Sequence, residues 1–328
     1  MVEKTTKFKS TTILIIVVSV LVGICAWFNR VLISDTFASL LSKITPETSQ
    51  VAENVGFTNY GRLVFSATNA NLENRDEFNE RCKSHDQDIS VLGCYTNGHI
   101  YIYDIKNDDL KGVVESTAAH ELLHAIWDRL DTGEKNRLSK YLLDVYNDEK
   151  YHEMLAEDLE NYNEIDRLDE LHSRIGTEVA DLPEELEKHY AKYFSNQDLV
   201  VDFYNSYIEP FKELAKEIEK LSAELEKLDA EIETRTKAYY ENAHNLAAQI
   251  EEFNNCAGTA GCFATQSIFQ ARRNVLQTAQ NALNEEFNAA NELVDKYNSL
   301  VTEYNENVIR GNTLEKAINS NSEIETIK

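Results

Sequence analysis

His120, Glu121 and His124 belong to the sequence HELLH, which lies in a run of helix-favouring and apolar residues from 113 to 130. Histidines four residues apart project from the same face of an α-helix, because four residues make little more than one turn. Such a pair can bind one zinc ion, and the glutamate between them can act on a water molecule without binding the metal. The motif therefore predicts hydrolytic chemistry, with His120 and His124 as metal ligands and Glu121 as the catalytic base.

The residues around the motif favour a helix buried in a domain core. Small side chains precede it at 117–119, and Ala125, Ile126 and Trp127 follow it. The simpler interpretation is a solvated surface helix whose histidines have no function, but solvated helices are seldom so rich in apolar residues. We therefore expect the HELLH helix to pack against other elements.

A catalytic zinc ion needs a third protein ligand and one open position for water. No third histidine follows His124 at the HExxHxxGxxH spacing, so the ligand must lie further along the chain. We expect it to be Glu170 in the middle of a predicted helix, with Glu178 as the alternative. His172 could stabilise a negatively charged transition state, although a surface or capping histidine is the simpler interpretation.

In these features the chain resembles the gluzincins, the thermolysin-like class of zinc metallopeptidases. The resemblance covers His120 to His124 closely and the downstream glutamate loosely. It implies a Zn²⁺ cofactor, a peptide or protein substrate, and hydrolysis of peptide bonds by a zinc-activated water with Glu121 as general base.

The charge of the chain limits its partners. Its 57 acidic residues outnumber its 32 basic ones, which gives a net charge of −25. This charge repels phosphate backbones, so nucleic acid is not expected as a partner. The 42% apolar content and only three prolines predict an ordered and mostly helical chain.

The N-terminus contains a candidate membrane anchor. Residues 10–29 carry no charge, and Lys4, Lys7 and Lys9 precede them. By length and by the positive-inside rule, this pattern predicts a single-pass protein of the cell membrane with a cytoplasmic N-terminus and an extracytoplasmic catalytic domain. A cleaved signal peptide is the alternative.

Four of the five cysteines fall into two pairs that are close in sequence, Cys82 with Cys94 and Cys256 with Cys262. This arrangement predicts two disulfide bonds, as expected outside the cytoplasm. Four free thiols in a reducing compartment are the alternative.

Alternating patterns before the HELLH helix predict strands at residues 62–68, 89–95 and 99–105, with a tight turn at Asn97 and Gly98. The fold class is therefore α+β, with a small antiparallel or mixed sheet packed on the HExxH helix. The edge of this sheet near residues 99–103 could hold an extended peptide substrate. Further helices are predicted at 72–82, 135–146, 151–162, 164–175 with Gly176 as its C-terminal cap, and 183–194.

Heptad spacing follows residue 210. Apolar residues recur in steps of four and three from Leu214 to Ile232, and every seven residues from Phe269 to Tyr304. Two such helices around a glycine-containing segment at 255–262 predict a long antiparallel coiled-coil hairpin. The hairpin offers a surface for a protein partner or for self-association.

These patterns divide the chain into a cytoplasmic N-terminus (1–9), a transmembrane anchor (10–33), a stalk (34–61), a zinc metallopeptidase domain (62–206), the coiled-coil hairpin (207–310) and a flexible tail (311–328). The alternative function is a membrane-anchored adhesion or scaffold protein with an inactive metallopeptidase-like domain. A coiled coil alone is compatible with either function, and metal content distinguishes them.

Overall fold

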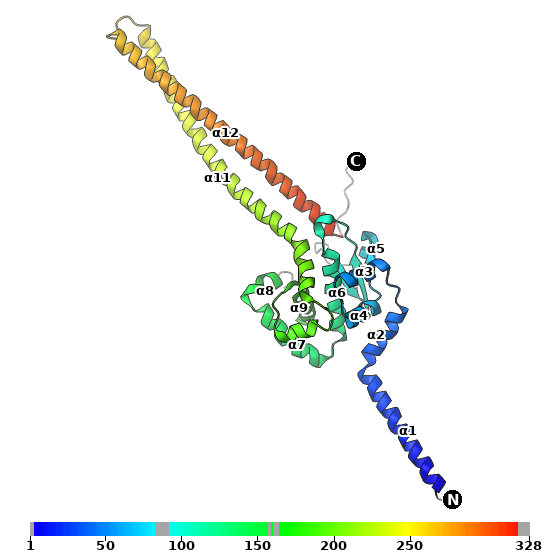
Figure 1. The fold of residues 1–328 in the computed structure, drawn as a ribbon. Helices are drawn as coiled ribbons and strands as arrows, with labels where there is room; N and C mark the ends of the chain where they lie inside the picture. Colours follow the sequence, from blue (N-terminus) through cyan, green and yellow to red (C-terminus); the bar gives the residue numbers. More distant parts are fainter. Residues whose placement is uncertain (1–2, 83–91, 157–158, 160–163, 321–328) are drawn as a thin grey trace. The chain divides into compact units, whose positions relative to one another are not determined.

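The computed structural model describes residues 3–82, 92–156, 159 and 164–320, with side chains from residue 14 onward apart from residues 164 and 165. The chain forms two compact units. The first comprises residues 1–210 and 314–328, and the second comprises residues 211–313. Most of the described residues are helical (Figure 1).

A three-stranded mixed sheet lies in the first unit. Its strands are β1 (Asn71–Glu73), β2 (Gly93–Thr96) and β3 (His99–Tyr103), in the order β1-β3-β2. β3 pairs in parallel with β1 and antiparallel with β2. Asn97 and Gly98 have the positive φ angles that a two-residue hairpin turn requires, as predicted. The expected strand at 89–95 is present only from Gly93, and residues 89–91 lie outside the described part of the chain.

Residues 62–68 are not a strand, contrary to the prediction. They belong to helix α4 (Asn59–Ala67), whose first turn is capped by the side chain of Thr58. Gly61 allows this helix to pack tightly, because a Cβ atom there would lie 2.4 Å from the backbone oxygen of Tyr193. Val64 and Phe65 are buried on the same side. Tertiary packing therefore outweighs the β-propensity of this segment.

The prediction of a stalk at residues 34–61 is wrong for its second half. Helix α2 (Arg30–Leu41) follows α1 (Glu3–Phe28), and α3 (Pro46–Asn54) then buries Val51 and Ala52 in the core. Val55 and Phe57 are buried immediately after it. Residues 46–61 are thus part of the globular unit.

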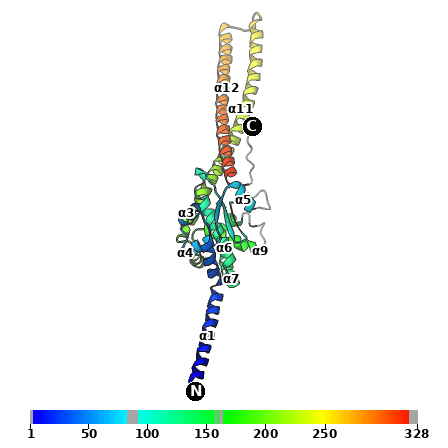
Figure 2. The same cartoon turned by 90° about the vertical axis from the view of Figure 1, so that its right-hand side faces the viewer.

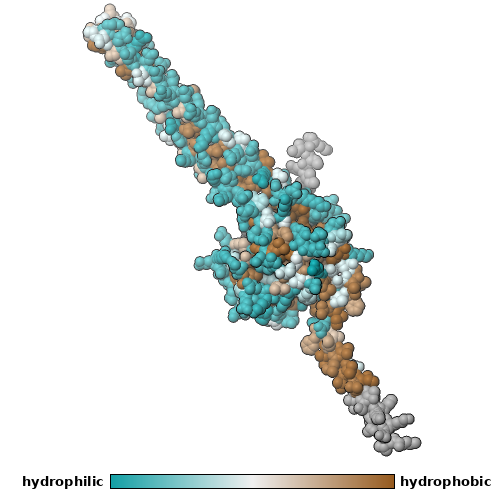
Figure 3. All heavy atoms as spheres, viewed as in Figure 1, coloured by the Kyte–Doolittle hydropathy of each residue, from teal (hydrophilic) through white to brown (hydrophobic). Residues whose placement is uncertain are grey.

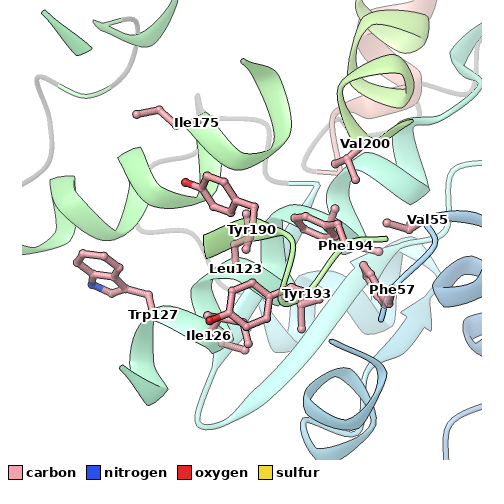
Figure 4. Close-up of a cluster of buried hydrophobic side chains, with 14 of the residues drawn as sticks. Val55, Phe57, Leu123, Ile126, Trp127, Ile175, Tyr190, Tyr193, Phe194 and Val200 are labelled. Carbon is pink, nitrogen blue, oxygen red and sulfur yellow. The ribbon is translucent and has the colours of Figure 1, made fainter. Parts of the chain in front are cut away.

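The HELLH helix, α6 (Val113–Arg129), is central to the first unit and contacts α3, α4, α9, β2 and β3. A 3₁₀ turn at Asp108–Leu110 precedes it. Figure 4 shows Leu123, Ile126 and Trp127 of α6 in the cluster of buried apolar side chains. The expected burial of this helix is therefore observed. The remaining helices of this unit are α5 (Arg75–Arg81), α7 (Thr132–Tyr146), α8 (Glu149–Ala156), α9 (Glu164–Glu178) and α10 (Glu184–Tyr190).

Helix α9 continues through Gly176, which the sequence analysis placed at its C-terminal cap. Gly176 serves close packing instead. A Cβ atom there would lie 2.4 Å from Leu123 Cδ1 and 2.6 Å from Tyr190 Cε1. The absence of a side chain allows α9 to approach α6 and α10.

The second unit contains most of two long helices, α11 (Gln197–Ala257) and α12 (Gln266–Ile318), which run side by side in opposite directions (Figures 1 and 2). The rings of Tyr239 and Phe287 lie 5.6 Å apart, and those of Phe253 and Phe269 lie 5.2 Å apart. The helices are thus paired as the heptads predicted. Pro210, expected near the start of this segment, lies inside continuous helix α11.

The prediction of a flexible tail at residues 311–328 is wrong for residues 314–320. Leu314 is buried, and two side chains of α5 donate hydrogen bonds to backbone oxygens beyond it. Arg75 donates to Lys316 and Asn79 donates to Ser320, at 3.2 and 2.7 Å. Residues 314–320 therefore complete the first unit.

The N-terminal helices present an apolar surface. In Figure 3 brown colouring covers α1 from residue 14 onward and much of α2, and all side chains of residues 14–28 are exposed. Within the described side chains, no single helix is long and apolar enough to cross a membrane. Leu14–Phe28 and Arg30–Leu41 meet that requirement only as a pair, across a bend of 71°.

Candidate metal centre

The site is formed where α6 meets α9. His120 and His124 lie one turn apart on α6, and Glu170 projects toward them from α9. The Nε2 atoms of the two histidines are 3.0 Å apart. The Glu170 carboxylate oxygens lie 3.6 Å from His120 Nε2 and 3.5 Å from His124 Nε2. The structure therefore brings together the three residues that the sequence analysis chose as metal ligands.

The spacing of these donor atoms is suited to a small divalent cation. Ligands bound tetrahedrally at about 2.0–2.2 Å lie about 3.3–3.6 Å from one another. The two Nε2 atoms are 3.0 Å apart, and each faces a different oxygen of Glu170, Oε1 at 3.6 Å from His120 and Oε2 at 3.5 Å from His124. One ligand atom from each of the three residues lies within 4.8 Å of the other two. The side chains of His120, His124 and Glu170 are 22, 18 and 15% exposed, so the group is accessible from one side. These features fit several divalent metals, not zinc alone.

The electrostatics of the group also favour a cation. Burial would raise the pKa of Glu170, but His120 and His124 lower it to about 2, so this carboxylate is ionised. Burial lowers the pKa of His120 to about 4, against the opposing effect of Glu170. His120 is therefore neutral at pH 7 and has the protonation state of a metal ligand.

Asp169 contacts one of the candidate ligands and was not predicted from the sequence. Its Oδ1 lies 2.8 Å from His124 Nδ1, the ring nitrogen that faces away from Glu170. Burial opposes protonation of His124, but Asp169 and Glu170 together hold its pKa well above its usual value. A carboxylate on the second nitrogen fixes the orientation of a metal-binding imidazole. The adjacent acidic pair Asp169-Glu170 was the available signal.

Glu121 follows His120 on α6 and lies against Gly93 of strand β2. It is 5% exposed, and the backbone N–H of Tyr95 donates a hydrogen bond to its carboxylate. Burial raises the pKa of Glu121 to about 7, although His124 and the Tyr95 N–H act in the opposite direction. A carboxyl group with this pKa can both accept and donate a proton near neutral pH.

Gly93 allows this close approach of β2 to α6. A Cβ atom at this position would lie 2.6 Å from Thr117 Cγ2 and 2.7 Å from Glu121 Oε1. Cys94, the next residue, forms the predicted disulfide with Cys82, with a Cα–Cα distance of 5.9 Å. The second predicted disulfide, Cys256–Cys262, is also present. The first bond ties β2 to the end of α5, beside the strand segment that contacts Glu121.

Glu178, the alternative third ligand, lies elsewhere. Its carboxylate accepts hydrogen bonds from the Arg174 guanidinium at 3.1 to 3.2 Å and is buried in that ion pair. It lies eight residues, more than two turns, beyond Glu170 on α9. The structure therefore brings Glu170 to the histidines and leaves Glu178 paired with Arg174.

His172 lies on the core-facing side of α9. The ring is fully buried, with Nε2 2.8 Å from His189 Nε2 and the Trp127 ring 5.0 Å away. Burial and His189 hold its pKa well below its usual value. Two residues along a helix rotate a side chain by about 200°, so His172 faces the core while Glu170 faces the metal ligands. The surface position considered for His172 is therefore wrong, and its role in stabilising a transition state stays a prediction.

A surface hollow of about 410 Å³ lies beside α8, lined by Asn147, Glu149, His152 and Glu153. It does not include any HELLH residue. The histidine and glutamate group is the stronger candidate site, because its ligand atoms converge on one point.

Comparison of the chain with protein-family models, curated proteins and solved structures finds no match.

Proposed function

We propose that this protein is a membrane-anchored, extracytoplasmic zinc metallopeptidase of the gluzincin type. The observation that carries the proposal is the convergence of His120 Nε2 and His124 Nε2, 3.0 Å apart, with the Glu170 carboxylate, whose two oxygens lie 3.6 and 3.5 Å from them. The buried Glu121 follows His120 on the same helix. Two imidazoles, one carboxylate and one adjacent glutamate form the ligand and base set of a hydrolytic zinc site.

Each residue has a distinct role in this proposal. His120, His124 and Glu170 hold the metal, and Asp169 orients His124 through its Nδ1 atom at 2.8 Å. A bound zinc ion acts as a Lewis acid that activates water and polarises a carbonyl group. Glu121 accepts the proton of the attacking water and delivers it to the leaving amine, which its pKa of about 7 permits.

The β2 edge of the described sheet supports a peptide as substrate. β3 pairs on both sides, with β1 and with β2, so residues 99–103 cannot accept a further strand and that expectation was wrong. In the described sheet β1 and β2 are the edge strands, and the Tyr95 N–H of β2 donates a hydrogen bond to Glu121. An extended peptide added to this edge would lie next to the catalytic base.

Membrane attachment belongs to the same proposal. Helix α1 is uncharged from residue 10 to residue 28, a length of about 28 Å at 1.5 Å per residue, close to the thickness of a bilayer core. Its described side chains are exposed on all sides. Lipid is the environment that suits such a helix, and the preceding lysines favour a cytoplasmic N-terminus.

The test compares the full wild-type chain with Glu121→Gln in detergent micelles. We expect both proteins to contain one zinc ion, and only the wild type to hydrolyse a fluorescently labelled unfolded protein. The amide of glutamine retains the shape of the side chain but cannot take up the proton. Hydrolysis by Glu121→Gln would refute the role of Glu121. A wild-type chain without bound metal would refute the enzyme and support an adhesion or scaffold protein.

A further inference from the structure

Helix α2 (Arg30–Leu41) buries an acidic residue and exposes apolar ones. Its acidic residue, Asp35, is 5% exposed and faces the protein, whereas Phe37, Leu40 and Leu41 are 65, 76 and 81% exposed. A helix at the surface of a water-soluble domain has the opposite arrangement, with its apolar side against the core. The outward face of α2 therefore requires a cover other than water.

The exposed apolar residues form one stripe. Ile33, Phe37, Leu40 and Leu41 follow one another in steps of four, three and one, which places them on a single face of the helix. The charged residues of α2 are Arg30, at the N-terminal end of this face, and Asp35, which lies on the opposite face. The stripe is thus an uninterrupted apolar surface.

The inner face of α2 is firmly attached to the HELLH helix. The Asp35 carboxylate accepts hydrogen bonds from Arg129 Nε and Nη2 at 3.0–3.1 Å, a two-pronged contact. Arg129 also donates to the backbone oxygen of Ala125 at 2.7 Å. This mostly buried ion pair fixes the rotation of α2, so the outward orientation of the stripe is a property of the fold.

A lipid bilayer suits the stripe better than a protein partner, because the stripe continues the surface of α1. Figure 3 shows the apolar colouring running over both helices. The two helices meet at a bend of 71°. With α1 crossing a bilayer, as proposed above, this bend would direct α2 along the bilayer surface. At the bend, Arg30 lies 5.2 Å from the Trp27 ring, and such residues are typical of the membrane–water interface.

We propose that α2 lies along the surface of a lipid bilayer, with Ile33, Phe37, Leu40 and Leu41 inserted among the acyl chains. The ion pair between Asp35 and Arg129 then fixes the C-terminal end of α6 to that surface. This inference rests on the proposed attachment through α1, but it does not depend on zinc binding or hydrolysis.

The experiment uses the full chain in phosphatidylcholine vesicles, with Cys25→Ser as background because the other four cysteines form disulfides. Single cysteines replace Phe37, Leu40 or, as a control, Lys106, whose side chain is 82% exposed in the loop after β3. Each carries a polarity-sensitive fluorophore. At positions 37 and 40 we expect a blue-shifted emission that nitroxide lipids quench and aqueous iodide does not. The label at position 106 should behave in the opposite way.

Three other outcomes would overturn the proposal. The two quenchers distinguish the first two, and flotation of the vesicles identifies the third. If the chain floats but iodide quenches labels 37 and 40, the anchor holds and α2 faces water. If neither quencher acts on these labels, protein and not lipid covers the stripe. If the chain does not float with the vesicles, the attachment through α1 fails together with the contact of α2.

Discussion

Two pairs of histidines lie in the first unit, and they differ in what surrounds them. The Nε2 atoms are 3.0 Å apart in His120–His124 and 2.8 Å apart in His172–His189. The side chains of the first pair are 22 and 18% exposed, whereas those of the second pair are completely buried. The two pairs therefore have similar contacts between their imidazoles in different environments.

Carboxylates make the difference. Glu170 and Asp169 lie 2.8–3.6 Å from the first pair, whereas in the described structure the carboxylate paired with His189 is that of Glu134, at 4.0 Å from Nδ1. Aromatic rings surround the second pair, namely those of Trp127, Tyr190 and Tyr193. An anionic and accessible environment favours a cation, and an aromatic and closed one favours neutral rings packed as core.

The strongest test of this contrast removes one member of each environment. Glu170→Ala should abolish stoichiometric zinc binding, because it deletes a ligand and leaves His120 and His124 without their carboxylate. His189→Gln should leave the zinc content unchanged. Both are measured by elemental analysis of the full chain after dialysis. Loss of zinc from His189→Gln would break the distinction between the two pairs.

A smaller effect is expected at the residue that orients His124. Asp169→Asn should weaken zinc affinity by about 10–100-fold, the usual effect of removing a carboxylate behind a metal-binding imidazole. Competition with a zinc-binding dye measures the change. Asp166→Asn, an exposed substitution on the same helix, serves as the control. Equal affinities for the two variants would show that Asp169 does not support the ligand.

The position of α9, which carries residues of both environments, depends on Gly176. Gly176→Ala should lower the free energy of unfolding by about 1–3 kcal/mol, because the new methyl group meets Leu123 and Tyr190 at 2.4–2.6 Å. Gly311→Ala is the matched control. This glycine is inside α12 with nothing within 4 Å, so alanine should be neutral or stabilise by up to about 1 kcal/mol. Chemical denaturation of both variants compares them.

The buried pair also predicts a dependence of stability on pH. Burial lowers the pKa of His189 from 6.5 to about 3, so between these values the unfolded chain binds more protons than the folded one. Stability contributed by the neutral ring is present above pH 6.5 and is lost as the pH falls, by about 1.4 kcal/mol per pH unit. His189→Gln should remove this part of the slope. Identical slopes of melting temperature against pH for both proteins would contradict it.

Local patterns in the sequence predicted the local features correctly. The HELLH helix, the Asn97-Gly98 turn, the paired heptads and both disulfides depend on residues close in sequence or on regular spacing. The choice of Glu170 over Glu178 was less secure. Both are helix glutamates, and only the rotation of α9 against α6 decides which one faces the histidines.

Features that depend on packing between distant segments were missed. Residues 62–68 look like a strand but form α4, because Gly61 and the buried Val64 and Phe65 fit a helix against the core. The contact of Asp169 with His124 joins residues 45 positions apart, and that of Asp35 with Arg129 joins residues 94 apart. No periodic pattern specifies such a pair, because each depends on how two helices pack.

The return of α12 to the first unit has a consequence for biosynthesis. The chain leaves this unit after residue 210 and re-enters it at residue 314, where Lys316 and Ser320 accept hydrogen bonds from α5. When a ribosome has translated HELLH, Glu170 and everything up to residue 210, the nascent unit still lacks its last segment. Its completion must wait for more than a hundred further codons, so a prematurely terminated product would contain every candidate catalytic residue on an unfinished scaffold.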